Sequence, residues 1–379
     1  MSETMIYVDN AATSELHPLV LEEMLPYLKE FYGNPSSLHS IGRKSKKAVE
    51  TARMKVASYF GRKMSHIYFT SGGTESDNLA LASAIKIGKK EGKKHIITSS
   101  IEHEGILSAL KHWEGQGIQV TYIDPDKNGN ISPSSIEKEI RPETCLISIM
   151  TINNELGSIQ EVREIQDLAR KHGVLFHTDA VQAIHYLPDQ FFYEFDMISI
   201  SAHKFYGPKG VGALITGPSI SLQPILFGGG QERGIRSGTE NVAAIVGMAK
   251  ALEINRETKE EEKQKVKELK DYFLNKIREE KGIELTVDQN MVSDHFIHLL
   301  IEGIHKDVLL YQLDKKGICA SSGSACSAGA TEESHVLKAI GLLEKDKAPL
   351  RMTINGKNSF EEMDYIANSL IEIRNRRLK

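Results

Sequence analysis

A lysine follows a short apolar run in the segment SAHKFYGPKG, residues 201–210. Lys204 is therefore expected just after a buried strand, among small and turn-forming residues that can hold it inside a cleft. Lysine amines form Schiff bases with carbonyl cofactors, and removal from water keeps the amine nucleophilic. Because a lysine at a strand end more often faces solvent, Lys204 indicates a cofactor site only together with other residues.

A glycine pair lies between an expected strand and an expected helix in the segment FTSGGTESDN, residues 69–78. Backbone N–H groups at such a turn, with the hydroxyls of Ser71 and Thr74 nearby, can hold a phosphate group that the helix dipole stabilises. The alternative is an ordinary strand-to-helix turn in which Thr74 caps the helix. The motif alone favours neither interpretation.

Three more polar residues follow apolar runs: Asp179, His103 and Asn154. A buried carboxylate needs a partner, and a protonated pyridine nitrogen at Asp179 would keep a cofactor ring electron-withdrawing. A helix cap or a structural salt bridge is the alternative for this residue. His103 can stack on a flat ring and move protons, although a lone histidine is more often an ordinary polar contact. Asn154 adds an uncharged donor.

These positions share one feature of open α/β sheets, in which ligands bind outside the carboxyl ends of the strands. Groups near residues 74, 103, 154, 179 and 204 all fall at such ends. Their convergence favours a cofactor site over separate turns and caps.

A cysteine lies in the segment CASSGSACSAGATEES, residues 319–334. The small residues around Cys326 predict a mobile, accessible loop that could carry a thiol between a cofactor and a partner. A free thiol with a pKa of about 8.5 is only a few per cent thiolate at neutral pH, so a reactive one needs local help. Cys319 is expected to be structural, and Cys145 is expected inside a core strand.

The composition limits the class of protein. The chain has 379 residues, of which 40% are hydrophobic, and a formal net charge of −4, which gives no overall basic field for nucleic acid. Its three cysteines are too few for a disulfide framework, and charges interrupt every apolar run, so a cytoplasmic protein without a signal peptide or membrane contact is expected. No zinc-type spacing of histidine or cysteine occurs, so no metal site is expected.

The elements that must position these residues alternate between strands and helices. Apolar runs predict strands at residues 66–70, 95–98, 118–123, 145–150, 174–178, 197–201 and 211–216. Helical patterns between several of them, such as residues 161–173, indicate an α/β fold with a mostly parallel sheet covered on both faces.

A long helical pattern begins at residue 241 and is expected to end at Gly282, with the charged stretch 257–270 as a solvated face. Shorter elements after it predict a second, smaller α/β unit. We expect a large cofactor-binding domain at residues 14–255, and a small domain at residues 1–13 and 256–379 that carries the Cys326 loop.

In chain order, several motifs resemble those of the cysteine desulfurases of the NifS/IscS type, which are pyridoxal-phosphate enzymes of fold type I related to class-V aminotransferases. The matching segments are YVDNAAT, GNPSSLHSIG, FTSGGTESDN, EH, NNELG, HTDAVQ, SAHKFYGPKG, GGGQERGIRSGT and SSGSACSAG. They cover nearly the whole chain, and the ordered set is specific although each motif is weak.

The resemblance implies a role for each candidate residue. Lys204 would carry pyridoxal 5'-phosphate, Asp179 would pair with its pyridine nitrogen, and Gln182 would contact its ring hydroxyl. His103 would stack on the ring and Asn154 would position it. The phosphate would be held by Gly73, Thr74, Ser201 and His203, and by Thr239 across the interface of a homodimer. Asn34 and Arg351 would bind the substrate carboxylate, which suits the guanidinium fork.

The same resemblance implies the reaction. L-Cysteine would displace Lys204 and lose its α-proton, and the thiolate of Cys326 would attack the substrate sulfur. A persulfide would then remain on Cys326 and L-alanine would leave. The motif SSGSAC resembles the group with the longer, mobile cysteine loop, which implies direct transfer of the persulfide to an acceptor protein.

The resemblance departs at the end of the chain. The sequence stops at RNRRLK, without the extension that many relatives use to bind an iron–sulfur scaffold. The sulfur acceptor is therefore left open between such a scaffold and a thiolation carrier.

Two rival hypotheses remain. One is another pyridoxal-phosphate reaction on the same fold, an aminotransferase or a selenocysteine lyase; an aminotransferase has no need of Cys326, whereas a selenocysteine lyase would use the same residues. The other is a non-catalytic scaffold protein, against which the joint presence of Lys204, Asp179, His103 and Cys326 argues.

Overall fold

The computed structural model describes residues 5–323, 333–342 and 346–377. Its largest sheet has seven strands in the order β2-β8-β7-β6-β5-β3-β4. Their bounds are β2 Ile67–Thr70, β3 His95–Ser99, β4 Gln119–Ile123, β5 Thr144–Ser148, β6 Leu175–Asp179, β7 Met197–Ser201 and β8 Gly212–Thr216. Strands β4, β3, β5, β6 and β7 pair in parallel, and β8 pairs antiparallel with both β7 and β2. The predicted strands and the mostly parallel sheet are confirmed.

The two faces of this sheet are buried in separate cores because neighbouring residues of a strand point to opposite sides. In β7, Met197 joins a core under helices α3 (Gly73–Lys90) and α4 (Glu104–Glu114), whereas Ile198 joins the core on the other face. Strand β8 repeats the alternation with Leu214 and Ile215. Apolar residues are therefore required on both faces, which explains why they occur at consecutive positions in these strands.

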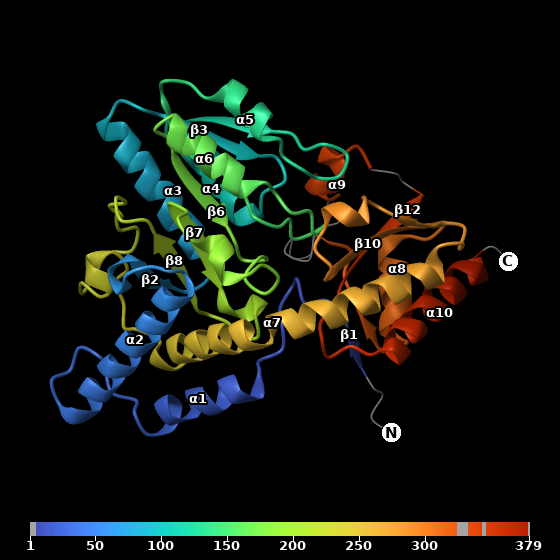
Figure 1. Ribbon diagram of the computed structural model, residues 1–379, viewed down its shortest axis with the longest axis horizontal. Coiled ribbons are helices and arrows are strands. Elements are labelled where there is room, and N and C mark those ends of the chain that lie inside the picture. The colour runs from blue at the N-terminus through green and yellow to red at the C-terminus, as the bar shows by residue number, and fades with distance from the viewer. Residues whose placement is uncertain (1–4, 324–332, 343–345, 378–379) are drawn as a thin grey trace.

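The helices that cover the sheet lie between its strands in the chain (Figure 1). Besides α3 and α4 they include α5 Pro133–Glu139 and α6 Val162–Lys171. Helix α6 ends as predicted, with Gly173 at φ +64° directly after its C-cap residue His172.

A smaller unit surrounds a second core (Figure 1). Its antiparallel sheet has the order β12-β10-β9, and β1 pairs in parallel with β11 beside it. The elements are β1 Ile6–Tyr7, β9 Ile283–Leu285, β10 Phe296–Glu302, α8 Lys306–Asp314, β11 Ile318–Cys319, β12 Lys347–Thr353 and α10 Phe360–Arg377. Ile6 and Val8 of the N-terminal segment contribute to this core. The core residues of α9 (His335–Ala339) instead pack with the large unit.

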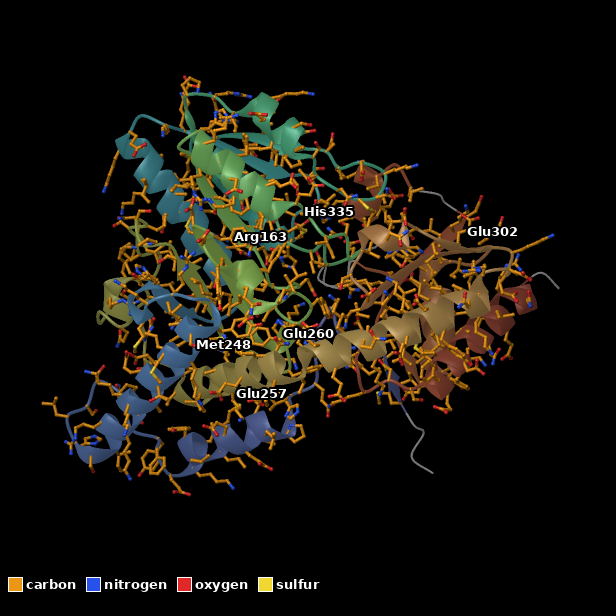
Figure 2. All side chains as sticks on the ribbon, in the orientation of Figure 1. Arg163, Met248, Glu257, Glu260, Glu302 and His335 are labelled. Atoms are coloured by element: carbon orange, nitrogen blue, oxygen red, sulfur yellow. The ribbon has the colours of Figure 1, made fainter. Side chains whose placement is uncertain are left out.

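Helix α7, Val242–Ile277, runs through both units. Helices α1 (Pro18–Lys29) and α2 (Ser40–Tyr59) pack on its first half, where Met248 is fully buried (Figure 2). The helix ends at Ile277, five residues before the predicted Gly282, which lies in the following turn at φ +75°.

The charged centre of α7 is only partly solvated. Glu257 and Glu260 are exposed, as predicted, but Lys259 is 5% exposed and donates a hydrogen bond of 2.8 Å to the Tyr59 hydroxyl. Glu262 accepts hydrogen bonds from Tyr206 and from the backbone of Gly356. The expectation of one solvated face was wrong because this stretch lies between the two units and carries the polar contacts that join them.

Candidate active site

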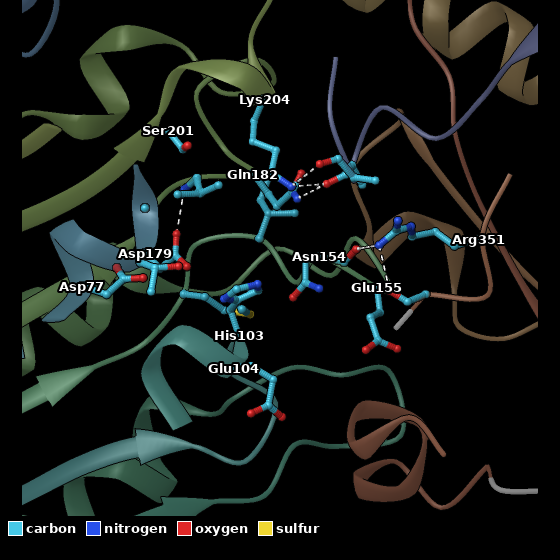
Figure 3. Close-up of a pocket in the computed structure, with 18 of the residues that line it drawn as sticks. Asp77, His103, Glu104, Asn154, Glu155, Asp179, Gln182, Ser201, Lys204 and Arg351 are labelled. Carbon is cyan, nitrogen blue, oxygen red and sulfur yellow. Dashed lines mark hydrogen bonds between the residues drawn. The ribbon is translucent and has the colours of Figure 1, made fainter. Parts of the chain in front are cut away.

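A cavity of about 320 Å³ opens at the carboxyl ends of the parallel strands, between the two units (Figure 3). Ten of the predicted site residues line it: Gly73, Thr74, His103, Asn154, Asp179, Gln182, Ser201, His203, Lys204 and Arg351. Asn34 and Thr239 do not line this cavity, and Cys326 lies outside the described residues.

Lys204 reaches the cavity from the short turn after β7. Its Nζ donates hydrogen bonds to the carbonyl oxygens of Ala11, at 2.5 Å, and Ala12, at 2.9 Å. The amide Nε2 of Gln182 donates to the same Ala11 oxygen at 2.9 Å. The N-terminal segment therefore closes one wall of the cavity and holds the amine of Lys204 at it (Figure 3).

Asp179 ends β6 at the cavity wall. One of its oxygens accepts the backbone N–H of Val181 at 2.8 Å. Burial raises the pKa of this carboxyl, whereas the nearby His103, the Val181 hydrogen bond and Lys204 lower it. A cation bound in the cavity beside Asp179 would relieve this cost of burial, which suits a protonated pyridine nitrogen.

A second carboxyl, Asp77 of α3, lies in the same wall as Asp179 (Figure 3). Burial raises its pKa well above the usual range, and the nearby Asp179 adds to the shift. Its Oδ1 lies 3.6 Å from Nε2 of the buried His177, and a hydrogen bond with Ser199 opposes the shift. Asp77 was not among the predicted site residues. The one feature of the sequence that could have indicated it is its place near the start of α3, soon after the glycine pair.

His103 is the N-cap residue of α4. Its Nδ1 accepts the backbone N–H of Gly105 at 3.0 Å, so this nitrogen carries no proton and a neutral ring has its proton on Nε2. An ordinary polar contact was the alternative to a site role for His103. The cap is such a contact, and it holds the ring at the cavity wall.

The glycine pair at the start of α3 is a candidate anion cradle. The helix begins at Gly73, and its N-cap residue Gly72, at φ +156°, provides no capping side chain. The alternative in which Thr74 caps the helix is therefore wrong. A Cβ atom on Gly73 would lie 2.7 Å from Cγ2 of Val181, so only glycine leaves this end of the helix open to the cavity.

Two predicted phosphate ligands lie at the same end of the cavity. The Oγ of Ser201 would lie 3.6 Å from a Cβ atom placed on Gly72. Nδ1 of His203 is 3.1 Å from the Thr13 hydroxyl, and burial lowers the pKa of His203 to about 4. Uncapped first-turn N–H groups with polar side chains beside them fit a phosphate group. Together with Asp179 and Lys204, the residues present fit pyridoxal phosphate.

Arg351 enters the cavity from β12 of the smaller unit. Its Nη2 pairs with Asp9 Oδ1 at 2.7 Å, and its Nη1 donates to the carbonyl oxygens of Asn154, at 2.7 Å, and Gly323, at 3.0 Å. The buried Nε has no partner among the residues that the structure describes. Binding of a substrate carboxylate by this guanidinium stays a prediction, and such a ligand would meet a fork that is already largely occupied.

Asn34 and Thr239 lie in two exposed segments outside the cavity. Asn34, between α1 and α2, accepts the backbone N–H of Ser36 at 2.8 Å. Thr239 lies in the same segment as Glu232. The Glu232 carboxylate accepts two hydrogen bonds from Arg53 of α2, at 2.6 and 2.8 Å, and so attaches this segment to the helix. Their roles at the site of a second copy stay predictions.

Two wider properties of the described chain bear on the site. No cluster of three or more histidine, cysteine, aspartate or glutamate side chains in this part of the chain is placed to hold a metal ion. None of the described helices is both long enough and apolar enough to cross a membrane.

The chain was compared with known proteins. Residues 6–366 match the family described as Aminotransferase class-V. The chain is 42% identical, over 370 residues, to the cysteine desulfurase IscS of Methanosarcina thermophila, covering 97% of this chain and 91% of that protein. A solved NifS-like protein superposes with a TM-score of 0.91 at 35% identity, covering 98% of this chain and 99% of that one. A structure described as SspA in complex with cysteine has a TM-score of 0.80 at 34% identity, covering 92% and 98%.

Proposed function

The chain belongs to the aminotransferase class-V family and is a pyridoxal-phosphate-dependent cysteine desulfurase, and we propose that Cys326 is the thiol that receives sulfur from L-cysteine. The observation that supports this proposal most is the composition of one cavity wall. Lys204, Asp179 and the glycine cradle line a cavity that also includes Gly323, three residues before Cys326.

Covalent geometry limits how far the thiol is from the cavity. A fully extended chain spans at most about 3.6 Å per residue, so three residues reach about 11 Å. The backbone of Cys326 is therefore tethered within about 11 Å of Gly323, whatever path the chain takes. Cys319, the half-buried thiol of β11, pairs with Tyr7 in a sheet, and its pKa is raised by burial. Burial therefore leaves less of the Cys319 thiol as thiolate at neutral pH.

The chain's own groups divide the work of the reaction. Bound pyridoxal phosphate supplies an electron sink for the pair left when the α-carbon loses its proton. Asp179 would keep the pyridine nitrogen protonated, and the first-turn N–H groups of α3 with Ser201 and His203 would hold the phosphate. His103 would stack on the ring, and the amine of Lys204 would bind the cofactor and move the proton at the α-carbon.

The sulfur step balances without an added oxidant. The thiolate of Cys326 attacks the sulfur atom of the bound L-cysteine, so one S–S bond forms as the bond between that sulfur and Cβ breaks. The electron pair of the broken bond goes to Cβ, which takes up a proton to become the methyl group of L-alanine. The enzyme keeps the sulfur as a persulfide.

The proposal extends to location and partners. We place the reaction in the cytoplasm, where three cysteines without a disulfide framework stay reduced. The persulfide passes to an acceptor protein, an iron–sulfur scaffold or a thiolation carrier.

A second copy of the chain completes the site in this proposal. Large apolar side chains are exposed in the two segments that carry Asn34 and Thr239: Tyr32 is 73% exposed, Leu38 88% and Phe227 82%. Exposed apolar surface of this kind supports a protein contact there, which would bring Thr239 to the phosphate of the other copy.

Product release from the holoenzyme tests the proposal. With L-cysteine and a reductant, the native protein and Cys319→Ser should release alanine and sulfide at similar rates. Cys326→Ser should keep its cofactor absorption but release neither product. If Cys326→Ser turns over at the native rate, Cys326 is not the sulfur acceptor and the proposal fails; an inactive, colourless native protein would support the scaffold hypothesis.

A further inference from the structure

Glu155 is a buried carboxylate that the proposed mechanism does not use. It follows Asn154 in the NNELG turn, is 2% exposed, and lines the cavity. Its backbone N–H donates to Oδ1 of Asn153 at 2.9 Å, and Nδ2 of Asn153 donates to the carbonyl oxygen of Ile101 at 3.0 Å. The turn is therefore fixed to the large unit, and the direction of the Glu155 side chain is fixed with it.

Ser334, the second described residue after the segment with Cys326, binds this carboxylate. Its Oγ donates a hydrogen bond of 2.6 Å to Oε2 of Glu155. The same Oγ accepts the backbone N–H of Leu337 at 3.1 Å, so the direction of the bond to Glu155 is set. Ser334 is 8% exposed and caps α9, which packs into the large core.

The chain before Cys326 ends at the same place. The carbonyl oxygen of Gly323 accepts from Nη1 of Arg351, which also donates to the oxygen of Asn154. A Cβ atom on Gly323 would lie 2.8 Å from Oε2 of Glu155, and Gly323 has φ +104°. The described residues on both sides of Cys326 are thus held at two consecutive residues, Asn154 and Glu155.

The surroundings of Glu155 suit an anchor. Burial raises the pKa of this carboxyl, whereas the Ser334 hydroxyl and then the nearby His335, Arg351 and His103 lower it. A buried acceptor that loses its donor is costly, so the bond to Ser334 is strongly favoured in the folded chain.

We propose that Glu155 is a positioning residue that, through Ser334, anchors the downstream end of the Cys326 segment at the cofactor cavity. The inference rests on the proposed function of Cys326. With Arg351 holding Gly323, the segment is tethered at both ends to one wall, which raises the effective concentration of the thiol at the substrate. Glu155 touches neither substrate nor cofactor in this role and acts through Cys326.

The test separates the sulfur step from substrate binding. The holoenzyme is mixed rapidly with L-cysteine, and two signals are followed: the change in cofactor absorption on substrate binding, and sulfur on Cys326 by mass spectrometry. Glu155→Ala and Ser334→Ala should slow persulfide formation about tenfold to a hundredfold and leave the absorption change at its native rate. The double variant should be no slower than the slower single variant, because both changes break one contact.

Conservative and distant variants control the result. Glu155→Gln keeps an acceptor and Ser334→Thr keeps the hydroxyl, so both should remain within about threefold of native. Glu161→Ala, at an exposed glutamate of the same large unit, should have no effect. A native rate in Glu155→Ala, an equal loss in the absorption change, additive single effects, or a slow Glu155→Gln would each overturn the anchor.

Amide hydrogen exchange distinguishes failure of the anchor from failure of the proposed function. Peptides that contain residues 334–342 should exchange faster in Glu155→Ala than in native protein or Glu161→Ala, independently of turnover. Unchanged exchange contradicts the anchor even in an active enzyme. Native protein that forms no alanine contradicts the proposed function, whatever the exchange shows.

Discussion

Arg351 of β12 and Asp9 of the N-terminal segment form an ion pair, with Nη2 2.7 Å from Oδ1, across 342 residues of sequence. The Arg351 side chain is 2% exposed and that of Asp9 is 17% exposed. The same guanidinium binds the carbonyl oxygens of Asn154 and Gly323. One buried cation therefore joins the smaller unit, the N-terminal segment and the NNELG turn at the cavity.

Asp9→Asn should destabilise the protein because it leaves the buried Arg351 charge without its anionic partner. Removal of one member of a buried pair costs about 3 kcal/mol or more. The free energy of unfolding in urea measures the effect. Glu15→Gln, which removes an exposed ion-pair partner of Lys357, is the control and should change stability by less than about 1 kcal/mol. Equal effects of the two substitutions would contradict the importance given to the Arg351 pair.

Gly73→Ala should weaken cofactor binding about tenfold or more, because the new Cβ would lie 2.7 Å from Val181 Cγ2 in the cradle. Titration of the apoprotein with pyridoxal phosphate, followed by absorption, measures the apparent Kd. Gly115→Ala changes a glycine after α4 with φ −61°, where a Cβ meets its first neighbour at 3.3 Å, and should bind normally. Native affinity in Gly73→Ala would mean that the cradle does not hold the phosphate.

Asp179→Asn should weaken cofactor binding and remove part of its pH dependence. Burial raises the pKa of Asp179 in the chain without cofactor, so its charged form is lost sooner than usual as the pH falls. Cofactor affinity of the native apoprotein should therefore decrease from pH 8 towards pH 5, and the decrease should be smaller in Asp179→Asn. Parallel pH profiles for the two proteins would exclude Asp179 as the partner of the pyridine nitrogen.

Glu102→Gln should stabilise the fold at neutral and higher pH. Burial raises the pKa of Glu102 to about 8, although hydrogen bonds from Ser99 and Met150 oppose the shift. A raised folded-state pKa gives stability that is full below the unfolded pKa of about 4.3 and is lost as the pH rises to about 8. Native protein should lose on the order of 3 kcal/mol over this range relative to Glu102→Gln.

The measurement is the free energy of unfolding in urea at pH 5 and pH 8 for both proteins. A difference between them that is the same at both values of pH would show that Glu102 titrates as an ordinary carboxyl.

The sequence predicted the large sheet and the meeting of the candidate site residues in one cavity because both depend on local pattern. Strands buried on both faces appear as apolar runs, and parallel topology brings residues after β3, β6 and β7 to one edge. His103, Asp179 and Lys204 therefore met in one cavity without any long-range information.

Contacts between distant segments were not predictable in this way. The pairing of Asp9 with Arg351 and the bond of Ser334 to Glu155 join residues 342 and 179 positions apart, and neither pair has a spacing that indicates contact. Lys259 was predicted on a solvated helix face because its buried partners, the Tyr59 hydroxyl and the Leu187 carbonyl oxygen, come from distant parts of the chain. Sequence pattern locates the site, whereas the tertiary fold determines which charges support it.

Direct detection of sulfur on Cys326 tests the central claim. The holoenzyme is given one equivalent of L-cysteine without reductant, and alanine is measured alongside the mass of the peptide that contains Cys326. The account predicts one added sulfur atom on Cys326 for each alanine formed, and none on Cys319 or Cys145. Alanine formed while Cys326 keeps its unmodified mass would contradict it.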